Sequence, residues 1–375
     1  MRVGLNLLHA LPEIGGGWNY IQNLLRGLAA DPSTEYVAFA NRVSAELVPS
    51  GLRVEVIPLR AGSRGQRLAF EHSALQILAL RRRLDCMHWF ANGQGIVNAV
   101  PGVVTVYDMQ PFLEHAPMPR AKRAFLRWNL QRAARRAAWL LPMSQTTAEA
   151  LTAVLGADPN RMTVVPPQLE STFRPSTAAE VSACRETYRL PANFFLYVAH
   201  LYPHKNHARL LQAYQRLRQG GGAAWPLVFR GDQRPDTPGL QPLVKAYGLE
   251  DSVTFLPRIP TASMPALYGA ASALIFPSLY EGAGIPVLEA QACGCAVVGS
   301  DIPAVREFAG DAAHYVDPLD VDSIARGMRA VAEEPALAGS LRERGLARAE
   351  SFRSIDVLAR LQDAYARASR LDTGK

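Results

Sequence analysis

The sequence predicts an α/β protein built from two successive units, each with a parallel sheet covered by helices. Short apolar runs alternate with segments of helical periodicity, as expected for parallel strands joined by helical crossovers. The alternation pauses in the proline-containing stretch 166–191 and then restarts. A length of 375 residues also suits two domains. We expect the units to face each other across a deep cleft, with ligands at the carboxyl ends of the strands.

The first unit starts with an apolar run at 2–8, a glycine-rich loop at 14–17 and then a helix. From Trp18 onward, apolar residues recur at spacings of three and four, which indicates helical periodicity. Further strands of this unit are expected at 36–40, 54–58, 86–90 and 103–107.

The second unit repeats the alternation of strands and helices. Its expected strands are 194–199, 227–230, 253–256, 274–277, 296–299 and 313–316. Its expected helices are 207–219, 287–293 and 302–308, and a last helix covers 354–370. We therefore divide the chain into an N-terminal domain, 1–170, a C-terminal domain, 171–353, and a C-terminal helix, 354–375.

The composition is that of an ordinary globular protein, with 49% hydrophobic and 19% charged residues. Four cysteines form too few disulfide bonds to hold a chain of this length together, which excludes a disulfide scaffold. No run of about 18 apolar residues would span a membrane. The N-terminal apolar stretch is too short for a signal peptide. We therefore expect a cytoplasmic protein with reduced thiols.

The net charge of +7 lies mostly in the first half, because residues 1–170 hold 18 basic and 12 acidic residues. Such asymmetry predicts an anionic partner. The basic segment 120–139 also carries Phe125, Trp128 and Trp139. It has two open interpretations: a helix lying on an anionic membrane, or an ordinary amphipathic helix with a solvated arginine face. No nucleic-acid-binding motif accompanies the charge, so nucleic acid is not an expected partner.

The strongest local signal is the loop 278–290, which follows an expected strand and opens a helix near Pro286. Free backbone N–H groups at a helix start can bind an anion. Gly282 and Gly284 allow the backbone to approach a phosphate or sugar closely. Glu281 and Glu289 bracket the loop and could reach one ligand from two sides. The alternative is that Glu281 caps the helix and Glu289 lies on the surface.

A second loop, 200–206, follows the expected strand 194–199 and offers Lys205 with two histidines, His200 and His204. Cations of this kind can stabilise a leaving diphosphate. The alternative is a solvated turn with Asn206 as the helix cap. The glycines Gly15, Gly16 and Gly17 form a third candidate, an anion-binding turn before the first helix, or else a flexible surface loop.

Tyr107 and Asp108 end the expected strand 103–107, where an aspartate can orient or deprotonate a hydroxyl. The alternative is an aspartate that caps the next segment. The D-x-D pattern at 320–322 is interpreted as a helix N-terminus. Cys293 and Cys295 are interpreted as buried thiols at a helix-to-strand junction. No metal site is therefore predicted.

Together these loops resemble family 4 of the retaining, nucleotide-sugar-dependent glycosyltransferases, which have the GT-B fold. The resemblance extends over about residues 2–365. Residues 278–298 are similar to the family's E-G-F-G-x-P-x-x-E-A-x-A-x-G-x-P-V signature. Ala283 replaces a phenylalanine of the family pattern, Tyr107 a histidine and His200 an arginine, and the segment 166–170 replaces its P-N-G-V-D turn.

The resemblance implies a GT-B fold with two Rossmann-like domains and a C-terminal helix that returns to the first domain. It implies that Glu281 lies by the anomeric centre of the donor sugar and that Lys205 binds the diphosphate. Asp108 would act near the acceptor and donor sugar, and Tyr107 would contact the acceptor. The other implied donor contacts are Gly15, Gly16, Gly17, His200, Arg230, Arg258, Gly282, Ala283, Gly284, Ile285 and Glu289.

The implied activity is retaining transfer of a hexosyl group from a nucleoside diphosphate sugar to an acceptor hydroxyl. A GDP-mannose-type donor is favoured over a UDP-hexose, and neither a cofactor nor a metal is expected. The expected acceptor is a glycan or a lipid-linked glycan of surface polysaccharide assembly, with peripheral contact to an anionic membrane. The alternatives are another GT-B enzyme, either a sugar-nucleotide epimerase or a phosphorylase, and a non-catalytic sugar-nucleotide-binding module.

Overall fold

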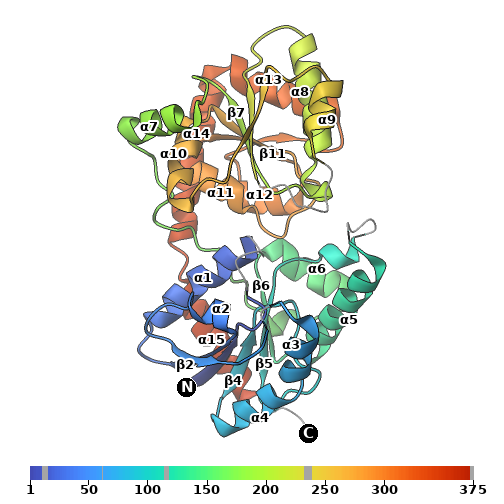
Figure 1. The fold of residues 1–375 in the computed structure, drawn as a ribbon, viewed down its shortest axis with the longest axis vertical. Helices are drawn as coiled ribbons and strands as arrows, with labels where there is room; N and C mark the ends of the chain where they lie inside the picture. Colours follow the sequence, from blue (N-terminus) through green and yellow to red (C-terminus); the bar gives the residue numbers. More distant parts are fainter. Residues whose placement is uncertain (11–15, 61, 114–117, 232–238, 372–375) are drawn as a thin grey trace. The chain divides into compact units, whose positions relative to one another are not determined.

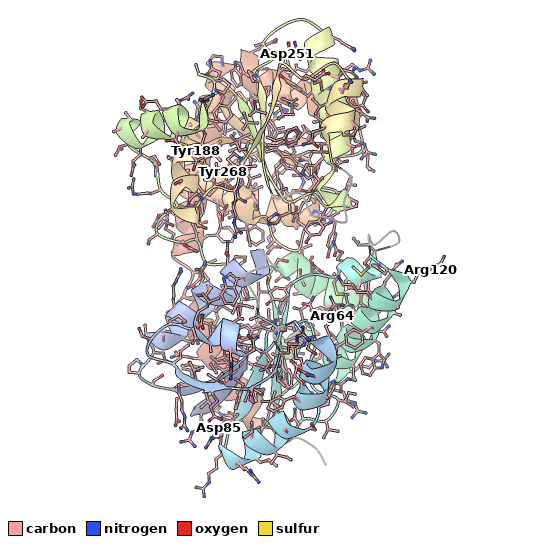
Figure 2. All side chains as sticks on the ribbon, viewed as in Figure 1. Arg64, Asp85, Arg120, Tyr188, Asp251 and Tyr268 are labelled. Carbon is pink, nitrogen blue, oxygen red and sulfur yellow. The ribbon has the colours of Figure 1, made fainter. Side chains whose placement is uncertain are left out.

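The computed structural model describes residues 1–10, 16–60, 62–113, 118–231 and 239–371. The chain divides into two compact units (Figure 1). Unit 1 comprises Met1–Gln168 with Asp356–Lys375, and unit 2 comprises Leu169–Ile355. In both units the side chains pack densely between strands and helices (Figure 2). The C-terminal segment thus belongs to the first unit, as the sequence resemblance implies.

Unit 1 contains, within its described residues, one six-stranded parallel sheet in the order β3-β2-β1-β4-β5-β6. Its strands are β1 (Arg2–Asn6), β2 (Glu35–Ala40), β3 (Arg53–Val56), β4 (Cys86–Trp89), β5 (Gly102–Val106) and β6 (Trp139–Pro142). Its helices are α1 (Gly16–Ala29), α2 (Arg42–Ala45), α3 (Arg64–Glu71), α4 (Ala74–Arg81), α5 (Arg120–Arg136), α6 (Gln145–Leu155) and α15 (Val357–Arg370).

Unit 2 contains, within its described residues, a second six-stranded parallel sheet in the order β12-β11-β10-β7-β8-β9. Its strands are β7 (Phe195–Val198), β8 (Leu227–Arg230), β9 (Val253–Leu256), β10 (Ala273–Phe276), β11 (Ala296–Ser300) and β12 (His314–Val316). Its helices are α7 (Ala178–Tyr188), α8 (His207–Gln219), α9 (Gln241–Ala246), α10 (Met264–Ala270), α11 (Ile285–Ala292), α12 (Pro303–Ala309), α13 (Val321–Glu333) and α14 (Pro335–Arg353).

Both sheets reverse their strand order at one point, between β1 and β4 in unit 1 and between β7 and β10 in unit 2. Right-handed crossovers that run in opposite directions from such a point place their helices on opposite faces of the sheet. In unit 2, α8 packs against α13, and α11 packs against α14. Open α/β sheets bind their ligands at the carboxyl ends of the strands beside such a reversal.

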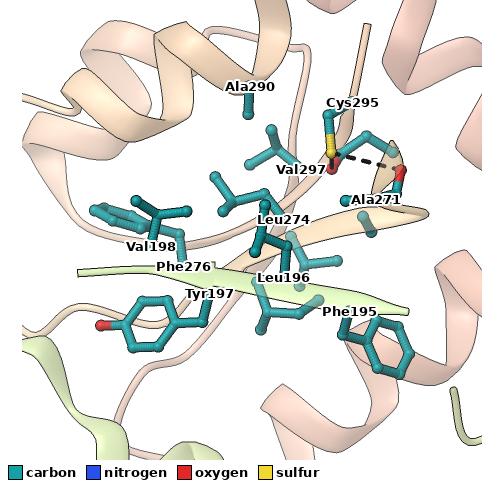
Figure 3. Close-up of a cluster of buried hydrophobic side chains, with 14 of the residues drawn as sticks. Phe195, Leu196, Tyr197, Val198, Ala271, Leu274, Phe276, Ala290, Cys295 and Val297 are labelled. Atoms are coloured by element: carbon teal, nitrogen blue, oxygen red, sulfur yellow. Dashed lines mark hydrogen bonds between the residues drawn. The ribbon is translucent and has the colours of Figure 1, made fainter. Parts of the chain in front are cut away.

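The core of unit 2 explains why its strands are continuous apolar runs. Phe195, Leu196, Tyr197 and Val198 of β7 are all buried, although successive side chains of a strand point to opposite faces. Because helices cover both faces, no position of β7 meets water. Figure 3 shows these side chains beside Phe276 of β10 and other members of the cluster.

Two differences from the sequence prediction concern the first helix and the segment 120–139. The first helix begins at Gly16, two residues before Trp18, so Gly16 and Gly17 lie in its first turn rather than in a loop. The segment 120–139 is not one helix, because α5 ends at Arg136 and the buried Trp139 starts β6. The first turn of a helix leaves its N–H groups without intrahelical partners, so glycine is tolerated there.

The last helix is held in unit 1 by a buried polar contact. The hydroxyl of Tyr365 lies 2.8 Å from Nδ1 of His88, whose Nε2 lies 2.8 Å from the hydroxyl of Thr105. The side chains of His88, Thr105 and Tyr365 are fully buried. None of the helices among the described residues is both long enough and apolar enough to cross a bilayer.

Candidate functional site

The candidate site of unit 2 lies at the reversal between β7 and β10. The loop 199–206 leaves β7, and the loop 277–284 leaves β10, at the same edge of the sheet. The backbone N–H of Leu279 donates to the carbonyl of His204 at 2.8 Å, which joins the two loops directly. The strand order therefore brings together two segments that are more than 70 residues apart in the chain.

Lys205 and Glu281 form an ion pair across these two loops. The ammonium Nζ of Lys205 lies 2.6 Å and 2.8 Å from the two carboxylate oxygens of Glu281. The side chains of Lys205 and Glu281 are only 16% and 8% exposed, so each charge is stabilised mainly by the other and little by water. Glu281 therefore does not cap the following helix, which was the alternative interpretation.

Asn206 occupies the N-cap position of α8, and its side chain holds the lysine loop in place. Its backbone is left-handed, with φ of 64°, and its side-chain amide donates to the carbonyls of Pro277 and Pro318 at 2.9 and 2.7 Å. The alternative interpretation is borne out for the N-cap position, although the Asn206 side chain is buried and makes no cap bond to α8. The buried amide instead fixes the spacing between the loops after β7, β10 and β12.

The start of α11 is shaped by close packing. Gly284 precedes the helix, and a Cβ built on it would lie 3.1 Å from Cβ of Phe308 on α12. The helix begins at Ile285 with Pro286 in its first turn, so backbone N–H groups remain available at the carboxyl edge of the sheet. Ala283 is partly buried against the core of unit 2.

Glu289 is not on the surface, contrary to the alternative interpretation. It is half-buried on α11, and the hydroxyl of Tyr268 on α10 donates to its carboxylate at 2.8 Å. Burial raises the pKa of Glu289 to about 7, against the opposing effects of this hydrogen bond and of the Arg230 charge. The two glutamates of the signature thus have different environments, since Glu281 is ion-paired and Glu289 is bound by a neutral phenol. Tyr268, labelled in Figure 2, had no signal in the sequence.

The arginines and histidines around these loops differ in charge and exposure. Arg230, at the end of β8, is half-buried and donates to the carbonyl of Ile259 at 3.1 Å, whereas Arg258 is exposed. Burial lowers the pKa of His204 to about 3, with a further decrease from the Lys205 charge. His204 is therefore neutral near pH 7, and the expectation that it supplies positive charge is wrong. His200 follows β7 and is half-buried.

Tyr107 and Asp108 lie in unit 1, directly after β5. An Asp108 oxygen accepts from the N–H of Gln110 at 2.9 Å, whereas Met109 holds the N-cap position of the turn Gln110–Phe112. The ring of Tyr107 packs edge-on against Tyr20, and its backbone N–H donates to the side chain of Asn92 at 2.7 Å. Gly16 and Gly17 start α1 in the same unit, and Gly15 lies outside the described residues.

The weaker motifs behave as the sequence predicts. Asp320 caps α13 by accepting from the N–H of Asp322 at 2.8 Å. Cys293 and Cys295 are buried free thiols between α11 and β11. Among the described residues, no group of three or more His, Cys, Asp or Glu side chains could hold a metal ion.

Comparison with known proteins gives the same class for both units. Residues 15–168 match the family "Glycosyl transferase 4-like domain", and residues 185–348 match "Glycosyl transferases group 1". The O-antigen chain mannosyltransferase B of Escherichia coli is 28% identical over 295 residues, covering 78% of this chain and 77% of the relative. The O-antigen chain mannosyltransferase RfbU of Salmonella typhimurium is 27% identical over 232 residues, covering 62% and 61%.

Solved structures of similar fold cover nearly the whole chain. Sucrose-phosphate synthase from Thermosynechococcus elongatus has a TM-score of 0.78 at 20% identity and covers 98% of both chains. HepE from Anabaena, in complex with UDP-glucose, has a TM-score of 0.77 at 17% identity and covers 99% of this chain and 100% of that chain. The two family matches and the named relatives indicate a glycosyltransferase rather than an epimerase, a phosphorylase or a binding module, whereas the solved structures show the fold alone. The chain therefore belongs to the family 4-like glycosyltransferases and has the GT-B fold.

Proposed function

We propose that this glycosyltransferase moves a hexosyl group, with retention of configuration, from a nucleoside diphosphate sugar to a hydroxyl of a glycan acceptor. The observation that carries the proposal is the Lys205–Glu281 pair beside the N-terminus of α11, at the carboxyl edge of unit 2. A lysine and a helix N-terminus both favour an anion, and a diphosphate is the anion that leaves in this reaction. We favour GDP-mannose as the donor, because two relatives are named O-antigen chain mannosyltransferases.

In the proposed reaction, the bond between the anomeric carbon and the diphosphate oxygen breaks, and a bond to the acceptor oxygen forms on the same face. The acceptor proton passes to the departing diphosphate, so no side chain acts as a nucleophile. Lys205 and the free N–H groups of α11 stabilise the negative charge that develops on the diphosphate. Glu281 faces the positive charge that develops at the anomeric carbon, which is oxocarbenium-like.

The remaining site residues are assigned as the family resemblance implies. Glu289 holds the ribose, and Gly282, Ala283, Gly284 and Ile285 offer backbone groups to the donor. Asp108 and Tyr107 of unit 1 serve the acceptor. Further donor contacts are assigned to Gly15, Gly16, Gly17, His200, Arg230 and Arg258.

A thermal-shift screen with GDP, UDP, ADP and dTDP tests the donor class. We expect GDP to give the largest shift of the melting temperature. A nucleotide at 100 times its Kd adds about 2.7 kcal/mol to stability, which such a screen detects. NMR of the product made from GDP-mannose should then give an axial linkage, as in the donor. An equatorial product would contradict retention, and the absence of any nucleotide shift would contradict the proposed function.

We also propose that unit 1 contacts an anionic membrane through α5. This helix carries seven arginines and lysines and no acidic residue over Arg120–Arg136. Phe125 and Trp128 on it are 40% and 45% exposed. The guanidinium of Arg132 packs over the Trp128 ring and donates to the carbonyl of Ile96 at 2.8 Å. This contact joins α5 to a loop whose Ile96 and Val97 are also exposed.

The surface thus combines positive charge with apolar side chains, which is the composition that binds anionic lipid headgroups. We expect the protein to float with vesicles rich in phosphatidylglycerol and not with phosphatidylcholine alone, and high salt should release it. Phe125→Ser with Trp128→Ser should weaken flotation, whereas Val154→Ser, at an exposed apolar position on α6, should not. The membrane proposal fails if the wild-type protein does not float at low salt.

A further inference from the structure

A buried tyrosine supports the second glutamate of the signature in unit 2. Tyr268 lies on α10 and Glu289 on α11, and the phenol hydroxyl donates to the carboxylate oxygen Oε2 at 2.8 Å. The side chain of Tyr268 is fully buried, whereas Glu289 is partly exposed. A ligand at this site therefore does not touch Tyr268, and any effect of the tyrosine on that ligand passes through Glu289.

The other carboxylate oxygen of Glu289, Oε1, is accessible to a ligand. Among the described residues it accepts no hydrogen bond, and it is not one of the buried polar atoms that lack a partner, so it meets solvent. An ionised carboxylate offers about four acceptor sites. Tyr268 occupies one of them, and the others can accept from two adjacent hydroxyl groups, such as those of a ribose.

The hydroxyl of Tyr268 does not need a carboxylate for its own hydrogen bonding. Tyr214, also buried in unit 2, donates to the backbone carbonyl of Ser252 at 3.4 Å. A carbonyl would satisfy Tyr268 equally well, without a carboxyl group that has to leave water. The cost of burying Glu289 is instead accepted at the edge of the proposed donor site, which indicates a role for the pair in binding.

Several groups control the ionisation of Glu289. Burial raises its pKa to about 7, the Tyr268 hydrogen bond lowers it, the Glu170 charge raises it and the Arg230 charge lowers it. Burial also raises the pKa of the Cys293 thiol, which follows α11 and is therefore neutral near pH 7. The pKa of Tyr268 lies well above 10 because the phenol is buried, so its hydroxyl always donates. Tyr268 thus favours the ionised form of Glu289.

We propose that Tyr268 is a positioning residue that keeps the Glu289 carboxylate ionised and oriented towards the ribose of the donor, so that the site selects ribonucleotides over deoxyribonucleotides. This inference rests on the proposed function, in which Glu289 holds the ribose, and it adds the residue that controls this contact. Hydrogen bonds to an ionised acceptor are about twice as strong as those to a neutral one. The selectivity should therefore follow the ionisation of Glu289.

The test is the ratio of the Kd of 2′-deoxy-GDP to the Kd of GDP, measured by calorimetry from pH 6 to pH 8.5. UDP and 2′-deoxy-UDP replace them if UDP gives the larger thermal shift. Because base and phosphates titrate alike in the two ligands, their effects cancel in the ratio. We expect the ratio for the wild type to rise from about threefold to about thirtyfold over this range. Tyr268→Phe should move that rise to higher pH, since the carboxyl loses a bond that favours its ionised form.

Tyr214→Phe is the matched control, because it removes a buried tyrosine hydroxyl from the same unit without touching Glu289. It should leave the ratio and its pH dependence unchanged, although both phenylalanine variants lose a hydrogen bond. Glu289→Gln should give a small ratio that does not vary with pH. Adding Tyr268→Phe to Glu289→Gln should change the ratio no further, because the tyrosine acts only through the carboxylate.

Tyr268→Phe keeps the ring beside Phe173, at a centroid distance of 6.3 Å, which favours correct folding. If this variant does not fold, 3-fluorotyrosine in place of Tyr268 supplies a stronger donor and should move the rise to lower pH. An unchanged pH dependence in either folded variant, or equal Kd values of the two nucleotides for the wild type, overturns the inference while the proposed function stands. Failure of the wild type to bind any nucleotide instead overturns the proposed function.

Discussion

Lys205→Ala is expected to lower the rate of sugar transfer by about 10²–10³-fold, the usual effect of removing one donor that stabilises charge in the transition state. Lys205 is only 16% exposed and lies between the loops after β7 and β10. His204 of the same loop is neutral near pH 7, because burial lowers its pKa to about 3. The measurement is kcat with GDP-mannose, or with UDP-glucose if UDP gives the larger thermal shift.

Measurements of nucleotide binding should distinguish the roles of Lys205 and Glu281. Lys205→Ala should weaken GDP binding about 10–100-fold, because a hydrogen bond to a charged group is worth about 1.5–3 kcal/mol. Glu281→Gln should transfer slowly yet bind GDP at least as tightly as the wild type, because it frees Lys205 from its partner. Glutamine keeps the shape of the side chain, which limits damage to the fold.

Lys245→Ala is the matched control, since Lys245 is exposed on α9 in the same unit. It should leave both turnover and GDP binding unchanged. Lys205→Ala also leaves the Glu281 carboxylate poorly solvated and unpaired, so its urea-unfolding midpoint must be measured alongside. Wild-type turnover by a folded Lys205→Ala variant would contradict the assignment of the lysine to the diphosphate.

Stability is expected to fall steeply as the pH is lowered from 6.5 towards 3. Burial lowers the pKa of His9, His88 and His204 to about 3 and that of His207 to about 4, against 6.5 for the free side chain. Between those values the unfolded chain binds more protons than the folded one. The stabilisation is therefore complete above pH 6.5 and is lost as the pH falls through the folded-state pKa values.

Each histidine contributes a slope of at most about 1.4 kcal/mol per pH unit. Glu289 acts in the opposite direction between about pH 4.5 and 7, because burial raises its pKa to about 7, and so offsets part of the loss in unit 2. Urea unfolding at pH 7, 6 and 5 measures the effect. A free energy of unfolding that does not change over this pH range would contradict the expected loss of stability.

Substitution of His88 tests whether buried histidines cause the pH dependence of the free energy of unfolding. His88→Gln should lower stability at pH 7 yet reduce the pH dependence of unit 1, because it removes one titrating group. Tyr365→Phe is the matched control, since it removes the hydroxyl 2.8 Å from His88 Nδ1 and keeps the imidazole. It should lower stability by about 1–3 kcal/mol at every pH, with the slope retained.

The regular elements of unit 2 were predictable to within a residue in several places. The strands β8 (Leu227–Arg230) and β9 (Val253–Leu256) and the helix α8 (His207–Gln219) match the expected bounds. Apolar strand runs in this unit are bounded by turn residues, and α8 stops before three glycines. The strand β6 (Trp139–Pro142) was missed, because its four residues follow a basic helix and end in proline.

The loops proposed to carry the chemistry were predicted from the sequence alone. Lys205 and Glu281 each follow a recognisable strand, and glycines and a proline mark the start of α11. These are local properties, since periodicity, turn residues and helix caps depend on neighbours a few positions away. The order of strands in each sheet, in contrast, depends on contacts between residues far apart in the chain.

Only the tertiary structure decided that Lys205 bonds to both oxygens of Glu281, 76 positions away, because β7 and β10 are neighbours in the sheet. The same holds for the raised pKa of Glu289 and the neutral His204, since burial sets both and burial is a property of the packed fold. His9 and Glu71 carry no sequence motif, and their hydrogen bonds to Phe90 and Asn6 join residues that are more than 60 positions apart in the chain.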